Sequence, residues 1–371
     1  MIILGLVKLL SKRGCIFSVH SCSSVISCCL LQSFLSSPKH KMQPHAPAPH
    51  PGNDPLENLK TTGKWVAMMI TISYMFGDLT VARQLNPDPR MNSWFLMSSP
   101  IPTILASFLF VAGVTWWGPQ YMRDRKPVSG LRPYMMAYNA IQVVFSGWLF
   151  WEAGMGGWFG SYSFVCQKCD YSGNPQAMRM LRVGYWYLLS KFVDFIDTIF
   201  FIMNKKNEHV SLLHVCHHSL MPVCMWYGVR HHSGGHTTLL ILLNSFVHTV
   251  MYLYYLLAAM GPRVRPFLWW KKYLTTLQIV QFLTVMVQNA MVFFVECAVP
   301  SVLLIWVNSM AVLFLILFTD FYIKAYRRTS KNQVVTSSRE SSSRLSLQTD
   351  TTTKIMTDLY RAELVRARTR I

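Results

Sequence analysis

The sequence predicts an all-α, polytopic membrane protein, and three observations support this fold class. Of its 371 residues, 52% are hydrophobic and only 14% are charged, which favours one membrane-embedded body over several soluble domains. Apolar runs long enough for membrane helices recur along the chain. The net charge of +19 comes from Lys and Arg residues at segment ends and in the tail, not from one basic patch. We therefore expect a lipid bilayer, and no nucleic acid, as the partner.

Composition divides the chain into three parts. Residues 1–54 are rich in Ser and Cys and then in Pro and His, which predicts a disordered or leader-like extension, with translation from Met42 as an alternative. Residues 55–325 hold the apolar runs and form the membrane domain. Residues 326–371 are rich in Ser, Thr and Arg, which indicates a cytosolic tail. Within the domain, segment 64–77 is too short to cross, so it is an interfacial helix or part of a tilted first span.

Seven apolar runs are candidate membrane spans. An odd number places the two ends of the bundle on opposite sides of the membrane, and loops rich in Lys and Arg mark the cytosolic side. The loops alternate in this respect, so the C-terminus is predicted to be cytosolic and the N-terminal end of the bundle lumenal. The runs cover about residues 100–118, 134–154, 183–203, 210–229, 238–259, 273–295 and 300–323.

Three cysteines fall on the predicted lumenal, oxidising side. Cys166 and Cys169 lie in the loop after the second run, and Cys297 lies in the loop after the sixth. A Cys166–Cys297 disulfide fits this placement, and Cys169 competes with Cys166 as the partner. The two neighbouring cysteines could instead form half of a zinc site, although the sequence has no second pair with this spacing.

Three histidines carry the strongest chemical signal. His214, His217 and His218 lie at positions i, i+3 and i+4 of the fourth run, so a helix would present three imidazoles on one face at bilayer depth. Polar side chains at that depth are costly and usually face a cavity or a partner. The same helical spacing relates Lys191, Asp194 and Asp197, then Asn244 and His248, and then Thr275, Gln278 and Gln281. This pattern predicts a polar cavity between four of the seven spans.

Each polar set has a structural alternative to direct chemistry. Inter-helix hydrogen bonds explain Asn244 and the two glutamines equally well. A buried ion pair that fixes helix register is favoured for Lys191 and its carboxylates. Four imidazoles on two spans, however, exceed what packing requires.

Two chemistries suit these imidazoles. A di-iron centre of the desaturase type would need more histidines, and although His232 and His236 form an HxxxH, their HHSGGH segment is predicted to be a loop. In acyl chemistry, by contrast, a neutral imidazole can act as nucleophile or base. A third alternative is a non-enzymatic receptor or lipid carrier.

Four segments together resemble one known family. KFVDFIDT, LLHVCHH, NSFVHTVMYLYY and TTLQIVQ occur in the order, and with closely similar spacing, of the motifs of the very-long-chain fatty acid elongases, which are membrane-bound 3-ketoacyl-CoA synthases. The similarity covers about residues 55–325. Asp194 stands where many members have Glu, a change that keeps the carboxylate and that we associate with arthropod-type members. The tail lacks the lysine-based endoplasmic-reticulum retrieval signal of many relatives.

The resemblance implies a fold, a reaction and a set of roles. Six of seven spans would form a barrel around an acyl tunnel in the endoplasmic reticulum membrane. A long-chain acyl-CoA would condense with malonyl-CoA to give 3-oxoacyl-CoA, CO₂ and CoA, without a cofactor or metal. Other enzymes of the elongation cycle and a second copy of the chain are candidate partners.

The family's roles can be carried over residue by residue. His217 would attack the acyl-CoA thioester, and His248 would orient or activate malonyl-CoA. His214, His218 and Asn244 would hold tautomers and stabilise the oxyanion. Substrate binding is assigned to Lys271 and Lys272 at the cytosolic mouth and to Lys191, Asp194, Asp197, Tyr252, Tyr255, Gln278 and Gln281.

Overall fold

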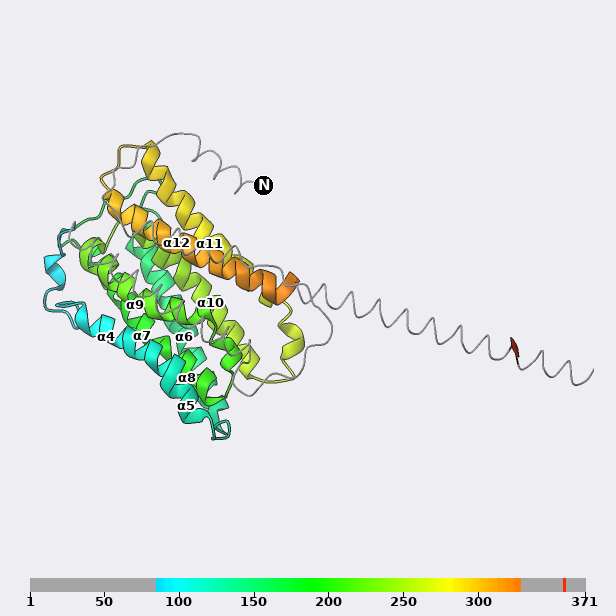
Figure 1. Ribbon diagram of the computed structural model, residues 1–371. Helices are drawn as coiled ribbons and strands as arrows, with labels where there is room; N and C mark the ends of the chain where they lie inside the picture. The colour runs from blue at the N-terminus through cyan, green and yellow to red at the C-terminus, as the bar shows by residue number, and fades with distance from the viewer. Residues whose placement is uncertain (1–84, 328–355, 358–371) are drawn as a thin grey trace, which may run out of the picture.

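The computed structural model describes residues 85–327 and 356–357, and these form helices joined by loops, with no strand among them. The long helices run side by side in an elongated bundle (Figure 1). The segments predicted at 1–54 and 64–77, and nearly all of the predicted tail, lie outside the described residues. In chain order the helices are α4 (Ile101–Ala112), α5 (Gly118–Met122), α6 (Leu131–Ala153), α7 (Pro175–Val193), α8 (Phe195–Met203), α9 (Leu212–His232), α10 (Leu239–Ala259), α11 (Lys271–Met291) and α12 (Ser301–Tyr322).

The all-α prediction is thus confirmed for the described residues, and every predicted apolar run falls on a helix or a pair of helices. Four stretches in this part of the chain are long and apolar enough to cross a membrane: Ile101–Met122, His236–Ala259, Lys271–Phe294 and Ser301–Tyr326. The chain is therefore a membrane protein with several membrane-spanning helices. The α6, α7 and α9 helices carry more polar residues, and their crossing of the membrane, like the barrel, stays a prediction.

The first long helical stretch changes its winding where it passes α8. A π-helical segment, Gly113–Trp117, joins α4 to α5, and Pro119 follows it without an N–H to continue α-helical bonding. A Cβ on Gly118 would lie 2.8 Å from the carbonyl oxygen of Gly113 and 3.0 Å from a side-chain carbon of Ile202. The glycine therefore allows α5 to approach α8 closely.

The histidine-bearing helix α9 has a fixed start and a fixed end. At its start, the Ser211 hydroxyl caps the helix by accepting a hydrogen bond from the backbone N–H of His214 over 3.3 Å. Near its end, the Arg230 guanidinium donates to the carbonyl oxygen of Asp88 over 2.5 Å and to Oδ1 of Asn92 over 2.7 Å. These contacts set the axial position of α9, and with it the depth of the histidines.

The loop that contains Asp88 is also held by Arg90. The guanidinium of Arg90 lies 2.6 Å from Oδ2 of Asp88 and also donates to the carbonyl oxygen of Ser172. Burial acts to raise the pKa of Asp88, but the hydrogen bonds from Arg90 outweigh it and hold this pKa below its usual range. The ion pair therefore stabilises the loop that anchors α9.

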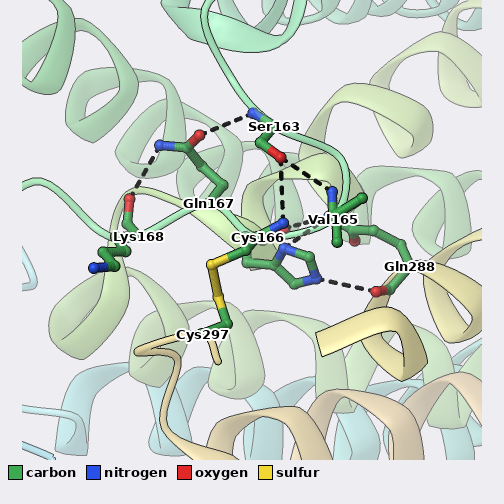
Figure 2. Close-up of a disulfide and its surroundings, with 8 residues drawn as sticks. Ser163, Val165, Cys166, Gln167, Lys168, Gln288 and Cys297 are labelled. Atoms are coloured by element: carbon green, nitrogen blue, oxygen red, sulfur yellow. Dashed lines mark hydrogen bonds between the residues drawn. A yellow bond between two sulfur atoms is a disulfide. The ribbon is translucent and has the colours of Figure 1, made fainter. Parts of the chain in front are cut away.

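A disulfide joins two loops at the same end of the bundle. Cys166, in the loop before α7, is bonded to Cys297, in the loop before α12 (Figure 2). Cys169, the alternative partner considered from the sequence, is a free cysteine. Ser163 supports the loop, since its hydroxyl oxygen accepts hydrogen bonds from the backbone N–H groups of Val165 and Cys166, each over 3.3 Å.

Candidate active site

A cavity of about 450 Å³ lies at the end of the bundle where α9 and α11 begin and α10 ends. Its wall takes residues from α6, α8, α9, α10, α11 and α12. Lys206, Glu208, His209 and Lys271, from the loop before α9 and the start of α11, line its mouth. The rest of the lining combines aromatic side chains, such as Phe282 and Phe318, with amides and imidazoles.

Most of the residues singled out from the sequence meet in this one cavity. Among the residues given a catalytic or substrate-binding role, Lys191, Asp194 and Lys272 are the exceptions and are not among its lining residues. The lining includes His214, His217 and His218 of α9, Asn244, His248, Tyr252 and Tyr255 of α10, Lys271, Thr275, Gln278 and Gln281 of α11, and Asp197 of α8. The helical spacing of polar residues, applied to each apolar run separately, thus identified side chains that line one common cavity.

The three imidazoles of α9 form a contiguous cluster. The ring centroids of His214 and His218 are 4.2 Å apart, and those of His217 and His218 are 5.3 Å apart. One ring nitrogen of His214, Nε2, lies 2.7 Å from the hydroxyl oxygen of Thr198 on α8. The ring of Phe314 packs against His217 at 5.2 Å between centroids. The cluster is therefore held by α8 and α12 as well as by its own helix.

A second helix, α7, holds the amide of Asn244 on α10, and a tyrosine of α10 itself lies beside the imidazole of His248. The hydroxyl of Tyr187, on α7, donates to Oδ1 of Asn244 over 2.7 Å. The His248 ring lies 5.7 Å from the ring of Tyr252, centroid to centroid. Asn244 and His248 are one turn apart on α10 and both line the cavity, so they present a donor and a ring nitrogen to the same space.

An ion pair lies behind the cavity wall. Nζ of Lys191 is 3.1 Å from Oδ2 of Asp194, and the two side chains are only 3% and 2% exposed. Oδ1 of Asp194 accepts hydrogen bonds from Gln142 over 2.9 Å and from the Tyr252 hydroxyl over 3.0 Å. The pair links α6, α7 and α10, which is the register-fixing arrangement favoured from the sequence.

Several residues of the site were missed from the sequence. Asn139, Gln142 and Ser146 of α6 are all buried, and Asn139 lines the cavity. Their spacing of i, i+3 and i+7 keeps them on one helix face, so the signal applied to the other spans could have found them. Tyr187, which bonds Asn244, and Thr198, which bonds His214, gave no such signal because single hydroxyls are common in apolar runs.

The second histidine group lies away from the cavity. The expectation of a loop at HHSGGH is only partly right, because His231 and His232 complete α9 and His236 opens a short 3₁₀ turn. A nitrogen of His236 contacts the carbonyl oxygen of Gln288 at 3.2 Å. His232 stands about 22 Å along the helix axis from His217. In residues 85–327 and 356–357, no group of three or more His, Cys, Asp or Glu is arranged to hold a metal ion.

Comparison with known proteins identifies the family of this chain. Residues 95–334 match the model of the GNS1/SUR4 (ELO) family. A very long chain fatty acid elongase of Aedes aegypti is 49% identical over 247 residues, which are 66% of this chain and 69% of the relative. The relatives named very long chain fatty acid elongase 7 are 47% identical in Drosophila melanogaster and 46% identical in Rattus norvegicus. The matches cover 66% and 65% of this chain and 75% and 86% of those relatives. The chain therefore belongs to the family of very long chain fatty acid elongases.

Proposed function

We propose that this chain catalyses the condensation of a long-chain acyl-CoA with malonyl-CoA to give a 3-oxoacyl-CoA, CO₂ and CoA. The observation that carries this proposal is the convergence of His217, His218, His248 and Asn244 on one cavity whose mouth carries Lys206 and Lys271. A cationic mouth suits the phosphates of CoA. Imidazoles packed among aromatic rings suit acyl transfer in a site from which water is excluded.

In the first step, a ring nitrogen of His217 attacks the thioester carbonyl carbon. The C–S bond breaks, CoA leaves, and the acyl group stays on the imidazole. The Asn244 amide and the neighbouring imidazoles of His214 and His218 supply hydrogen-bond donors for the oxyanion. Fixed donors suit this task because Thr198 and Tyr187 already hold His214 and Asn244 in place.

In the second step, malonyl-CoA occupies the mouth that CoA has left. Its carboxylate departs as CO₂, and the electron pair left on the methylene carbon attacks the acyl carbonyl carbon. The bond to His217 breaks, which restores the neutral imidazole and releases the 3-oxoacyl-CoA. His248, on the neighbouring helix α10, orients the malonyl thioester. This step transfers no electrons to or from a cofactor, so the proposal includes neither cofactor nor metal.

The cellular setting is part of the proposal. We place the chain in the endoplasmic reticulum membrane as a seven-span bundle with a cytosolic C-terminus, in which six spans surround the acyl tunnel. The cavity mouth then faces the cytosol, where acyl-CoA and malonyl-CoA are dissolved. The Cys166–Cys297 disulfide lies at the opposite end of the bundle, on the oxidising side, which supports this orientation.

The direct test is a condensation assay. Membranes that contain the full chain are incubated with a panel of acyl-CoAs and labelled malonyl-CoA, without NADPH. We expect labelled 3-oxoacyl-CoA and an equal amount of CO₂. Neither product from any acyl-CoA, with folded protein present in the membrane, would refute the proposal. Activity that requires oxygen and stoichiometric iron would favour the desaturase alternative.

The covalent step is tested by two substitutions in the same helix. Without malonyl-CoA, the wild type should release about one CoA per chain, because acylation stops after one turnover. His217→Ala should abolish this burst, whereas His232→Ala, which changes a buried histidine outside the cavity, should keep it. A full burst from a folded His217→Ala chain would place the acyl group on another residue.

A further inference from the structure

The hydroxyl of Tyr252 lies between two carboxyl groups. Its oxygen is 3.0 Å from Oδ1 of Asp194 and 2.8 Å from Oδ2 of Asp197. A hydroxyl carries one proton, so it can make a full hydrogen bond as donor to only one of these oxygens. The second contact is favourable only if the carboxyl group supplies a proton of its own. The geometry therefore calls for one protonated carboxyl among the two.

The charges around the carboxyl groups of Asp194 and Asp197 also indicate that one of the two is protonated. Both carboxyl groups are buried, with Asp194 1% and Asp197 8% exposed. Within the described residues, the cation bonded to this group is Lys191, which can neutralise only one of them. Asp197 lies in the first turn of α8, where the helix dipole favours a negative charge, but this preference is much smaller than the cost of an unpaired buried carboxylate. One carboxyl is therefore neutral.

The contacts decide which of the two holds the proton. Asp194 is bonded by Lys191 and by Gln142, both of which stabilise a carboxylate. The groups that act on Asp197 are Lys191 and Asp194, Tyr138 from α6, and Tyr252 and Tyr255 from α10. None of the groups in direct contact with Asp197 is a cation. The ionised member is Asp194, and the protonated member is Asp197.

The reaction needs such a proton. This step rests on the proposed function: condensation of an acyl-CoA with a malonyl-CoA carboxylate to 3-oxoacyl-CoA, CO₂ and CoA thiol consumes one proton in each turnover. Asp197 lines the cavity, whereas Asp194 does not. We propose that Asp197 is a carboxylic acid at neutral pH, held in that form by Tyr252 and the Lys191–Asp194 pair, and that it donates its proton to the departing CoA sulfur.

The proton balance is complete. As the C–S bond breaks, its electron pair goes to sulfur, the O–H bond of Asp197 breaks, and an S–H bond forms. The resulting carboxylate accepts the hydrogen bond of Tyr252 until CoA thiol leaves. It then regains a proton from water that enters through the mouth. A neutral Asp197 also spares the malonyl carboxylate a like charge inside the cavity.

The protonation state is tested without activity. The infrared spectrum of the purified full chain should contain the C=O stretch of a protonated carboxyl at neutral pH. Asp197→Asn should remove this band, and Asp320→Asn, which changes an acid in an exposed ion pair, should keep it. A wild-type spectrum without the band, or an Asp197→Asn spectrum that keeps it, would overturn the assignment. The condensation assay above can succeed or fail independently of this result.

The donor role is tested by kinetics. Asp197→Asn keeps the shape of the side chain but has no acidic proton, so kcat should fall about 100-fold or more, with the KM for acyl-CoA within about twofold. The wild type should lose turnover as rising pH removes the proton, and Asp197→Glu should move this alkaline limb. A purely structural role would leave the limb unmoved in Asp197→Glu. That result, or an Asp197→Asn enzyme with wild-type kcat, would overturn the donor role.

Discussion

Replacing Asp194 by Asn should destabilise the chain because it leaves the Lys191 ammonium buried without its countercharge. The two side chains are 3% and 2% exposed and 3.1 Å apart, and breaking a buried pair on one side typically costs about 3–5 kcal/mol. Asn keeps the shape of Asp and can still accept a hydrogen bond from Gln142 or Tyr252. The loss of stability in this variant therefore measures the effect of removing the negative charge. Asp197 can ionise in the variant and offset part of the unpaired positive charge of Lys191. We therefore expect a destabilisation at the lower end of this range, about 3 kcal/mol.

The assay is thermal unfolding of the purified full chain, in a double-mutant cycle with Lys191→Met. Removing both charges should recover most of the loss, since no uncompensated ion is then left in the interior. Asp194→Glu should cost less than Asp194→Asn because it keeps a carboxylate at the position. The exposed Lys324–Asp320 pair is the control: it is shorter, at 2.6 Å, but its side chains are 57% and 46% exposed.

The burial of an ion pair, and not the distance between its charged atoms, determines how much each of these two pairs contributes to stability. Asp320→Asn should change the unfolding free energy by less than about 0.5 kcal/mol, the usual range for an exposed helical pair. Equal effects of Asp194→Asn and Asp320→Asn would refute the reasoning. A double variant no more stable than Asp194→Asn alone would also refute it, because the cost would then come from lost packing and not from an unpaired charge.

Two further predictions concern the ends of the bundle. Lys271→Ala should raise the KM for acyl-CoA about 5- to 10-fold, as expected for one charged contact with a phosphate, and should weaken its dependence on salt; an unchanged KM would remove Lys271 from the CoA site. Because Arg90 lowers the pKa of Asp88, this ion pair stabilises the fold above the unfolded-state pKa of about 4 and loses that contribution as pH falls further. Asp88→Asn should therefore be less stable than the wild type at pH 7 and less sensitive to acid, measured as melting temperature against pH; parallel curves for the two proteins would contradict this.

Helical periodicity predicted much of the site because the bilayer penalises polar groups strongly. In water, an Asn or Gln on a helix says little, but within apolar runs each such residue needs a partner or a cavity. Asn244, Gln278 and Gln281 were placed correctly on the cavity side for this reason. The same physics applied to Asn139 and Gln142 of α6, which were overlooked although their spacing carries an equal signal.

The spacing of polar residues along the sequence did not predict which of them reach the cavity and which lie behind its wall. Lys191, Asp194 and Asp197 follow one another at three-residue steps, which predicts one shared face. The structure instead separates them, because α7 ends at Val193 and α8 begins at Phe195, with Asp194 at the junction. Asp197 reaches the cavity while Asp194 stays behind it. A helix break without Pro or Gly leaves no clear signal in a sequence. The sequence alone therefore does not distinguish Asp197, which lines the cavity, from Asp194, which lies behind its wall.

The division between these two carboxyls explains how a reactive cavity can exist beside a full buried ion pair. A carboxylate or ammonium next to His217 would bias its protonation and repel one of the two substrates. Here the charged atoms of Lys191 and Asp194 contact Tyr187, Gln142 and Tyr252, and of these only Tyr252 reaches the cavity wall. Besides the neutral Asp197 of our proposal, the cavity that holds the imidazoles is lined by hydroxyls and amides such as Tyr252 and Asn244, which can donate to a developing oxyanion without drawing a proton from histidine. Two further cations, Lys206 and Lys271, line the same cavity, and in the proposed reaction their charge attracts the phosphates of the CoA substrates.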